Sequence, residues 1–210
     1  MLNGEKARIA VLVSGGGTNL QALLDAQSGG ILRSGRIVLV VSNKPGAYAL
    51  TRAENAGVET AVLTKADCGG QNGFEERLTE LLRARDIDLI ILAGFMNILS
   101  AEFTGKWPEQ IINVHPSLIP SFCGEGFYGL RVHEAALSYG VKVTGATVHF
   151  VNEIPDGGRI IAQKAVEILP EDTAETLQRR VMEQAEWILL PRAAESVSAD
   201  ILKKRRNDND

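Results

Sequence analysis

Residues 9–21 read IAVLVSGGGTNLQ and join a short apolar run to three consecutive glycines and then to a segment of helical character. The apolar run Ile9–Val13 is continuous rather than alternating, which is typical of a parallel strand buried on both faces. The glycines end this run, and the helical segment Asn19–Gln27 follows. A strand, a glycine turn and a helix in this order predict the first βα unit of an α/β sheet.

The same alternation continues through the first half of the chain. Further strands are expected at Ile37–Val41, Leu89–Leu92 and Ile111–Val114. Helices are expected at Ala47–Ala56 and Phe74–Arg85. This spacing is typical of repeated βαβ units, so we predict that these strands are parallel.

The pattern changes after about residue 140. Two extended runs, Val143–Val151 and Arg159–Ile168, flank a loop rich in acidic residues, Pro and Gly, and they predict an antiparallel pair. A long helix is expected over residues 173–204, and Pro191 should kink or break it.

The chain of 210 residues has the length of one generous domain. We predict a single α/β domain with a Rossmann-like open sheet, mainly parallel with an antiparallel C-terminal portion and flanked by helices. The domain should cover residues 1–198, and residues 199–210 should form a charged C-terminal tail.

Composition excludes several classes of protein. There are 22 Lys and Arg against 26 Asp and Glu, a net charge of -4, which argues against a nucleic-acid-binding surface. No apolar run is long enough to cross a membrane. The 3 His and 2 Cys show no metal-ligand spacing, so no metal is expected. Two isolated Cys favour a reducing, cytoplasmic setting.

The segment Ser14–Gln21 (SGGGTNLQ) is the first candidate ligand site. Consecutive glycines let the backbone approach a ligand, and a helix N-terminus offers free N–H groups to an anion such as phosphate. Leu20 stands where a dinucleotide fingerprint has its third glycine, and no Walker motif follows. The alternative is a tight turn in which Thr18 or Asn19 caps the helix.

Asn113 and His115 form the second candidate site. They are two residues apart at the end of an expected strand, so both face the same side, at the edge where α/β sheets bind ligands. An amide beside an imidazole can polarise a carbonyl and move a proton. Asp156 is either a turn residue or a carboxylate that favours protonated His115, and His149 alone is typical of a buried core histidine.

Four motifs together carry a resemblance. They are SGGGTNLQ at 14–21, LAGFM at 92–96, INVHPSL at 112–118, and HFV with DGG at 149–158. In this order and spacing the chain resembles the phosphoribosylglycinamide formyltransferase family from about Ile9 to Pro191. The resemblance implies the formyltransferase fold. It also implies transfer of a formyl group from the co-substrate 10-formyltetrahydrofolate to the amine of glycinamide ribonucleotide, in de novo purine synthesis.

The resemblance also assigns roles to residues. The catalytic residues it implies are Asn113, His115 and Asp156. The ribonucleotide-binding residues it implies are Gly15, Gly16, Gly17, Thr18, Asn19, Pro116 and Glu186, although Glu186 alone reads as an exposed helical acid. The folate-binding residues it implies are Met96, Asn97, Ile98, Leu99, Asn113 and Val151.

The chain departs from the family pattern at three places. Asn97 stands where the family usually has Arg, and Gln71 where many members carry a basic residue near the ligands' charged groups. The segment 121–130 is Gly-rich and longer than in some members, and we expect a mobile loop there. The resemblance further implies that the Ile119–Pro120 bond is cis.

The implied partners are the two small substrates, with no nucleic acid and no membrane, for a cytoplasmic monomer or weak homodimer. Another formylfolate-dependent enzyme is the nearest alternative, either a hydrolase or a sugar or tRNA formyltransferase. The tRNA enzyme should have an added C-terminal domain and a basic surface, and the hydrolase an added N-terminal domain. A non-catalytic nucleotide-phosphate-binding protein is the other alternative, and it leaves Asn113, His115 and Asp156 unexplained.

Overall fold

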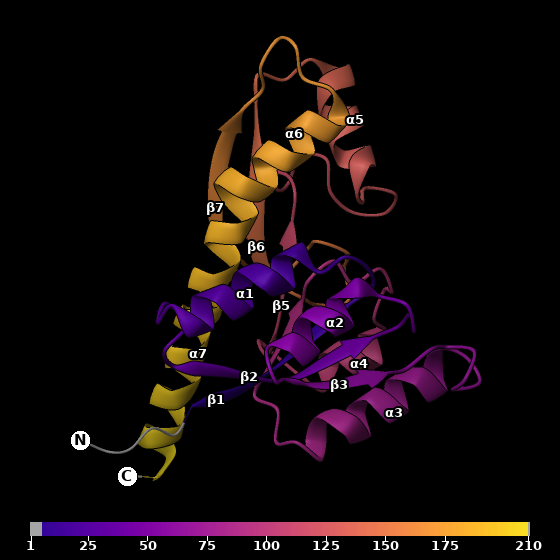
Figure 1. Ribbon diagram of the computed structural model, residues 1–210, viewed down its shortest axis with the longest axis vertical. Coiled ribbons are helices and arrows are strands. Elements are labelled where there is room, and N and C mark those ends of the chain that lie inside the picture. Colours follow the sequence, from indigo (N-terminus) through magenta and orange to yellow (C-terminus); the bar gives the residue numbers. More distant parts are fainter. Residues whose placement is uncertain (1–5, 210) are drawn as a thin grey trace.

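The computed structural model describes residues 6–209, which form one seven-stranded sheet flanked by helices (Figure 1). The sheet has the order β3-β2-β1-β4-β5-β6-β7. The parallel strands are β1 (Ala7–Val13), β2 (Gly35–Ser42), β3 (Glu59–Val62), β4 (Leu89–Leu92) and β5 (Ile111–His115). The strands β6 (Val143–Phe150) and β7 (Ile160–Glu167) are antiparallel to their neighbours. The predicted mixed sheet is therefore confirmed.

The helices of the first half are α1 (Thr18–Ser28), α2 (Tyr48–Asn55) and α3 (Gln71–Arg83), which confirms three predicted helices. Three elements were not predicted: β3, α4 (Ala101–Gly105) and α5 (Leu130–Tyr139). Both β3 and α4 are very short, and β3 is an edge strand whose sequence ETAV is partly exposed.

The continuous apolar run of β1 is explained by two cores, one on each face of the sheet. Ile9 and Val11 belong to the core that is shared with α1 and with the last helix of the chain. Ala10 and Leu12 belong to the core on the other face, which is shared with α3. Because both faces are covered, neither face of β1 needs polar residues.

The last part of the chain is helical but not one regular helix. It comprises α6 (Ala174–Val181), a π-helical turn η1 (Met182–Glu186) and α7 (Trp187–Asn209). Thr173 is the N-cap of α6 and accepts from Thr176 N, completing a capping box. The irregular turn lies before Pro191, and α7 continues through Pro191, so the predicted break there is wrong. Pro191 lacks the N–H that would bond to the carbonyl of Trp187 four residues earlier, and the π-helical turn that ends at Glu186 comes directly before that position.

The end of α7 lies against the start of the sheet (Figure 1). α7 packs on α1 and on the strands β1 and β2. Arg205 near its end donates to the buried carboxylate of Asp88, which precedes β4. The charged segment after residue 198 is thus helical through Asn209. Within residues 6–209, no helix is both long and apolar enough to cross a membrane.

Candidate active site

A cavity of about 810 Å³ opens at the carboxyl ends of β4 and β5. It is lined by residues from all four sequence motifs. The predicted site residues among them are Asn19, Met96, Asn97, Ile98, Leu99, Asn113, His115, Pro116, Val151, Asp156 and Glu186. The remaining predicted residues, Gly15 to Thr18, lead into α1 beside this cavity, and Thr18 lines a neighbouring groove between α1 and α7.

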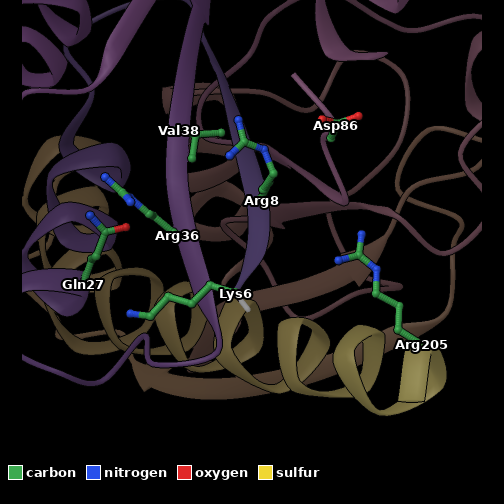
Figure 2. A pocket seen from close by; sticks show the side chains of 7 residues that line it. All are labelled: Lys6, Arg8, Gln27, Arg36, Val38, Asp86 and Arg205. Atoms are coloured by element: carbon green, nitrogen blue, oxygen red, sulfur yellow. The ribbon is translucent and has the colours of Figure 1, made fainter. Parts of the chain in front are cut away.

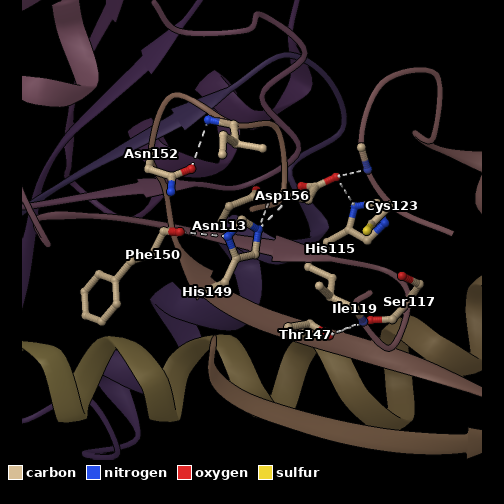
Figure 3. Close-up of polar contacts among 12 residues, drawn as sticks. Asn113, His115, Ser117, Ile119, Cys123, Thr147, His149, Phe150, Asn152 and Asp156 are labelled. Carbon is tan, nitrogen blue, oxygen red and sulfur yellow. Dashed lines mark hydrogen bonds and ion pairs between the residues drawn. The ribbon is translucent and has the colours of Figure 1, made fainter. Parts of the chain in front are cut away.

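The pairing of β5 with β6 sets the position of Asn113. Asn113 lies directly opposite His149 in the antiparallel register, and its Nδ2 is 3.2 Å from His149 Nε2 (Figure 3). The other ring nitrogen, Nδ1, lies 2.9 Å from the carbonyl oxygen of Phe150 and donates to it. Whenever Nε2 carries no proton, it accepts from Nδ2 of Asn113, and this contact holds the side chain of Asn113 at the cavity wall.

Asp156 lies between two imidazoles (Figure 3). Its Oδ2 is 3.4 Å from Nδ1 of His115, and its Oδ1 is 3.5 Å from Nε2 of His149. Oδ2 also accepts from the backbone N–H of Gly124 at 2.9 Å. A second proton on either ring would therefore face this carboxylate, so the three side chains can share and move protons as one unit.

His115 is surrounded by acceptors on both sides. Its Nε2 lies 2.8 Å from the carbonyl oxygen of Phe122, and its Nδ1 faces Asp156. The doubly protonated ring donates to both acceptors, whereas the neutral ring donates to only one.

Burial of the ring is the largest influence on the pKa of His115. His115 is 4% exposed, and burial lowers its pKa below the ordinary 6.5, although Asp156 and the Phe122 carbonyl act in the opposite direction. Asp156 acts on His115 in the expected direction by raising its pKa, but burial of the ring is the larger effect, so the pKa of His115 stays below 6.5.

The carboxylate of Asp156 stays ionised. Burial raises the pKa of Asp156, but the hydrogen bond from His149, the attraction of His115 in its protonated form and the Gly124 N–H together bring the pKa below the usual 3.8. At neutral pH the site therefore contains a fixed negative charge beside a ring that can accept a proton.

The two glycines after Asp156 allow its loop to return over β6. A Cβ atom on Gly158 would stand 1.7 Å from the carbonyl oxygen of Phe150, so only glycine fits there. Asp156 itself has a φ of 55°, a left-handed conformation that non-glycine residues rarely adopt. The close return and the unusual backbone together direct the carboxylate toward His115 and His149.

The glycine loop ends with Gly17 as the N-cap of α1. Gly17 has a φ of 73°, and a Cβ there would lie 2.6 Å from Cβ of Ala49. Among the residues that the structure describes no side chain caps α1, so the alternative in which Thr18 or Asn19 is the cap is wrong. The first N–H groups of α1 therefore have no side-chain acceptor and remain available to an anion.

Glu186 is buried rather than exposed. It ends the π-helical turn η1, is 6% exposed and accepts from Nδ2 of Asn19 at 2.7 Å. Burial raises the pKa of Glu186 to about 7, and the hydrogen bond from Asn19 partly offsets this effect. The contact joins the start of α1 to the last helical region at the cavity wall.

The segment Met96–Leu99 is held from both sides. Met96 N donates to Ser14 Oγ at 2.8 Å, and Gln71 Nε2 donates to the carbonyl oxygen of Ile98 at 3.1 Å. Gln71 also donates to the buried carboxylate of Glu75. At the position where the resemblance leads us to expect a basic residue, this chain therefore has an amide that holds the backbone of the segment.

The sequence analysis gave no site role to three side chains at or near the cavity, of which His149 is buried as expected. His149 could have been found from the β5–β6 pairing, which places it opposite Asn113. Glu75 also accepts from the backbone N and the hydroxyl of Ser100, directly after Leu99. His133 lines the cavity from the unpredicted helix α5, fully buried and with no partner for either ring nitrogen within residues 6–209.

The loop after β5 contributes two backbone groups to the site. The Ile119–Pro120 bond is cis, as the resemblance implies. The following turn supplies the Phe122 carbonyl and the Gly124 N–H to the site. In the part of the chain that the structure describes, no group of three or more His, Cys, Asp or Glu is placed to hold a metal ion.

Comparison with known proteins identifies relatives over most of the chain. A family model described as formyl transferase matches residues 7–193. A trifunctional purine biosynthetic protein adenosine-3 of Drosophila melanogaster is 44% identical over 196 residues, which is 92% of this chain and 14% of that protein. The chain thus spans only a small part of this relative's length.

Shorter relatives match over most of their own length. A phosphoribosylglycinamide formyltransferase of Haemophilus influenzae is 41% identical over 177 residues, which is 84% of this chain and 81% of that protein. The crystal structure of a glycinamide ribonucleotide transformylase 1 from Symbiobacterium toebii superposes with a TM-score of 0.87 at 40% identity. It covers 94% of this chain and 90% of its own.

Proposed function

The chain belongs to the formyl transferase family, and from this we propose that it transfers a formyl group from 10-formyltetrahydrofolate to the amine of glycinamide ribonucleotide in de novo purine synthesis. The observation that carries the proposal is the cluster of Asn113, His115 and Asp156 in a cavity that the uncapped start of α1 borders. A formyl acceptor that carries a phosphate needs side chains that catalyse the transfer and a helix N-terminus that binds the phosphate.

The ribonucleotide binds along the side of the cavity formed by α1. Its phosphate accepts from the N–H groups at Gly17, Thr18 and Asn19, where the helix dipole is positive. Glu186, held by Asn19, lies where it can accept from hydroxyl groups of the sugar. Pro116 lines the same cavity after β5.

The formylfolate binds against the segment Met96–Leu99 and Val151. The carbonyls and N–H groups of this segment are held by Ser14 and Gln71, so they present a fixed pattern to the planar ring of the folate. Ile98 and Met96 are exposed apolar side chains at this wall, which suits burial of an aromatic ligand. Asn97 contributes backbone contacts, and its change from the usual Arg leaves these contacts in place.

The reaction is a direct transfer. The amine nitrogen forms a bond to the formyl carbon, and the carbonyl oxygen becomes an oxyanion, to which Asn113 donates. The new negative charge adds to that of Asp156 and raises the pKa of His115, so the ring takes up the proton that the amine loses, and its positive charge stabilises the oxyanion. Collapse breaks the bond from carbon to the folate nitrogen, and that nitrogen receives the proton that the amine has lost.

A direct assay tests this proposal. Purified protein is mixed with a formylfolate analogue, and the absorbance of the released folate is followed with and without glycinamide ribonucleotide. We expect release only when the ribonucleotide is present, in step with formylated product. Release without ribonucleotide would identify a hydrolase, and no release with it would contradict the proposal.

The proposed partners are these two small molecules. We also propose a cytoplasmic monomer or weak homodimer that works without a metal. Sedimentation at several protein concentrations tests the assembly, and turnover that survives treatment with a chelator tests the metal-free mechanism.

A further inference from the structure

A second large pocket lies at the other end of the sheet, at the amino ends of β1 and β2. Its volume is about 830 Å³, similar to that of the active-site cavity. Four cationic side chains line it: Lys6, Arg8, Arg36 and Arg205. Figure 2 shows Arg8 and Arg36 on neighbouring strands, with Gln27 to one side and Arg205 to the other. We call it the amino-end pocket.

Two of the arginines are forced together by the strand register. Arg8 of β1 pairs directly with Arg36 of β2 in the parallel ladder, so both side chains leave the same face of the sheet. Like charges at paired positions repel and destabilise the sheet. Lys6 adds a third positive charge just before β1. The protein as a whole carries a net charge of -4, so this concentration of cations is local.

The neighbouring carboxylates offset only part of this positive charge. Asp88 accepts from the backbone N of Arg8 and from Arg205. The guanidinium of Arg8 makes one contact, from Nε to the carbonyl oxygen of Arg85 at 2.6 Å. Within residues 6–209, the side chains of Arg36 and Lys6 have no hydrogen bond or ion pair, and Asp86 is the one carboxylate on the pocket wall.

The pocket also offers neutral binding groups. Gln27 accepts from Ile37 N through Oε1 at 2.7 Å, which leaves its NH₂ group free to donate into the pocket. The half-buried side chain of Val38 adds an apolar surface. Arginine forks match the oxygens of phosphate, and several close cations favour a ligand with several negative charges.

We propose that the amino-end pocket binds a multivalent phosphate anion, such as inorganic pyrophosphate or the phosphate chain of a nucleotide. Binding removes the repulsion between Arg8 and Arg36 and gives Arg36 and Lys6 partners. The site is separate from the proposed ribonucleotide site, because the two lie at opposite ends of β1.

Calorimetric titration with inorganic pyrophosphate, ATP and adenosine tests the proposal. The titrations use a Thr18→Asp protein, in which a carboxylate at the start of α1 repels phosphate from the active site. We expect both phosphates to bind and adenosine not to bind. Equal affinities would assign the site to the phosphate chain, and tighter binding of ATP would assign it to a nucleotide.

Adding Arg36→Ala to this protein should weaken phosphate binding by about tenfold or more, the scale of one charge-assisted hydrogen bond. Arg77→Ala is the matched control, since Arg77 is an exposed arginine on α3 outside the pocket. In the wild-type background Arg36→Ala should leave formyl transfer unchanged, which shows that the fold is intact. Unchanged phosphate affinity in the Arg36→Ala protein, binding of adenosine, or no binding of either phosphate would overturn the proposal.

Discussion

The carboxylate of Asp156 is the charged group that lies between the two histidines of the site. It faces His115 and His149, and its pKa stays low although it is half-buried. An ionised group in this position stabilises a proton on either ring as charge develops on the substrate. Asp156 stabilises the transition state more than it stabilises the bound substrates. Its removal should therefore lower turnover more than it weakens substrate binding.

We expect Asp156→Asn to lower kcat by about 10²- to 10⁴-fold, the usual contribution of a positioned acid–base group. The KM for the ribonucleotide should change little, because Asp156 lies away from the start of α1. The pH–rate profile should also shift, since His115 loses its charged neighbour. Steady-state kinetics across pH measure all three quantities, and near-normal turnover would remove Asp156 from the mechanism.

His133 makes a different residue-scale prediction, on stability. Burial lowers its pKa to about 4 from the ordinary 6.5, so the folded protein favours the neutral ring. The unfolded chain binds this proton at higher pH than the folded chain does. Stability should therefore be lost as pH falls from about 6.5 toward 4, by up to about 3 kcal/mol from this residue.

His133→Leu removes this titration and leaves no polar atom unpaired. Urea unfolding at pH 7.5 and pH 5 should show a smaller loss of stability in this variant than in the wild type. Glu134→Gln, next to it on the outer face of α5, is the control. An equal loss in all three proteins would contradict the assigned role of His133.

At the scale of elements, α1 brings a positive helix end to the cavity. Its N-cap is a glycine without a side-chain cap, so the charge of the helix end is not already neutralised. Thr18→Asp places a carboxylate in the first turn, where it competes with the phosphate for the same N–H groups.

The KM for the ribonucleotide should rise at least about tenfold in Thr18→Asp, while the melting temperature stays near that of the wild type. The fold is spared because an acidic residue in the first turn favours the helix. Thr18→Ser is the conservative control. If the ribonucleotide KM is unchanged, the phosphate binds elsewhere.

The helix α3 acts on the proposed folate wall through Glu75. This buried carboxylate accepts from Gln71 and from Ser100, which flank the segment Met96–Leu99 in space and in sequence. Glu75 is thus a positioning residue, since it reaches the ligand wall only through these neighbours.

Glu75→Gln keeps the shape but loses one acceptor oxygen, so Ser100 and Gln71 can no longer both be satisfied. We expect the KM for formylfolate to rise about three- to tenfold, with the ribonucleotide KM and kcat nearly unchanged. Glu76→Gln changes an exposed neighbour on α3 and serves as control. A uniform loss in all three parameters would indicate a purely structural role.

At the scale of the whole molecule, the sequence predicts what depends on local order. The β1–α1 unit, the parallel strands and the antiparallel pair were predicted because their apolar runs and glycine turns are contiguous in the chain. Asn113 and His115 were placed on one side of a strand end for the same reason.

What was missed depends on contacts between distant segments. The helix α5 is stabilised by packing on α6, and no strong sequence pattern marks its start after a glycine loop. The burial of Glu186 follows from the π-helical turn, and a regular helix was expected there. The lowered pKa of His115 follows from burial of its ring. Burial is a property of the folded site, and the spacing of residues along the sequence does not reveal it.

The packing of α7 has a consequence for the order of events during synthesis. β1 is synthesised well before α7, but one of its faces is covered by α1 and α7 together. Until residues after 187 emerge, side chains such as Ile9 and Leu20 have no permanent cover. The nascent chain therefore stays partly open until α7 has been synthesised. Chaperones that bind exposed apolar surface are suited to protect it during this time.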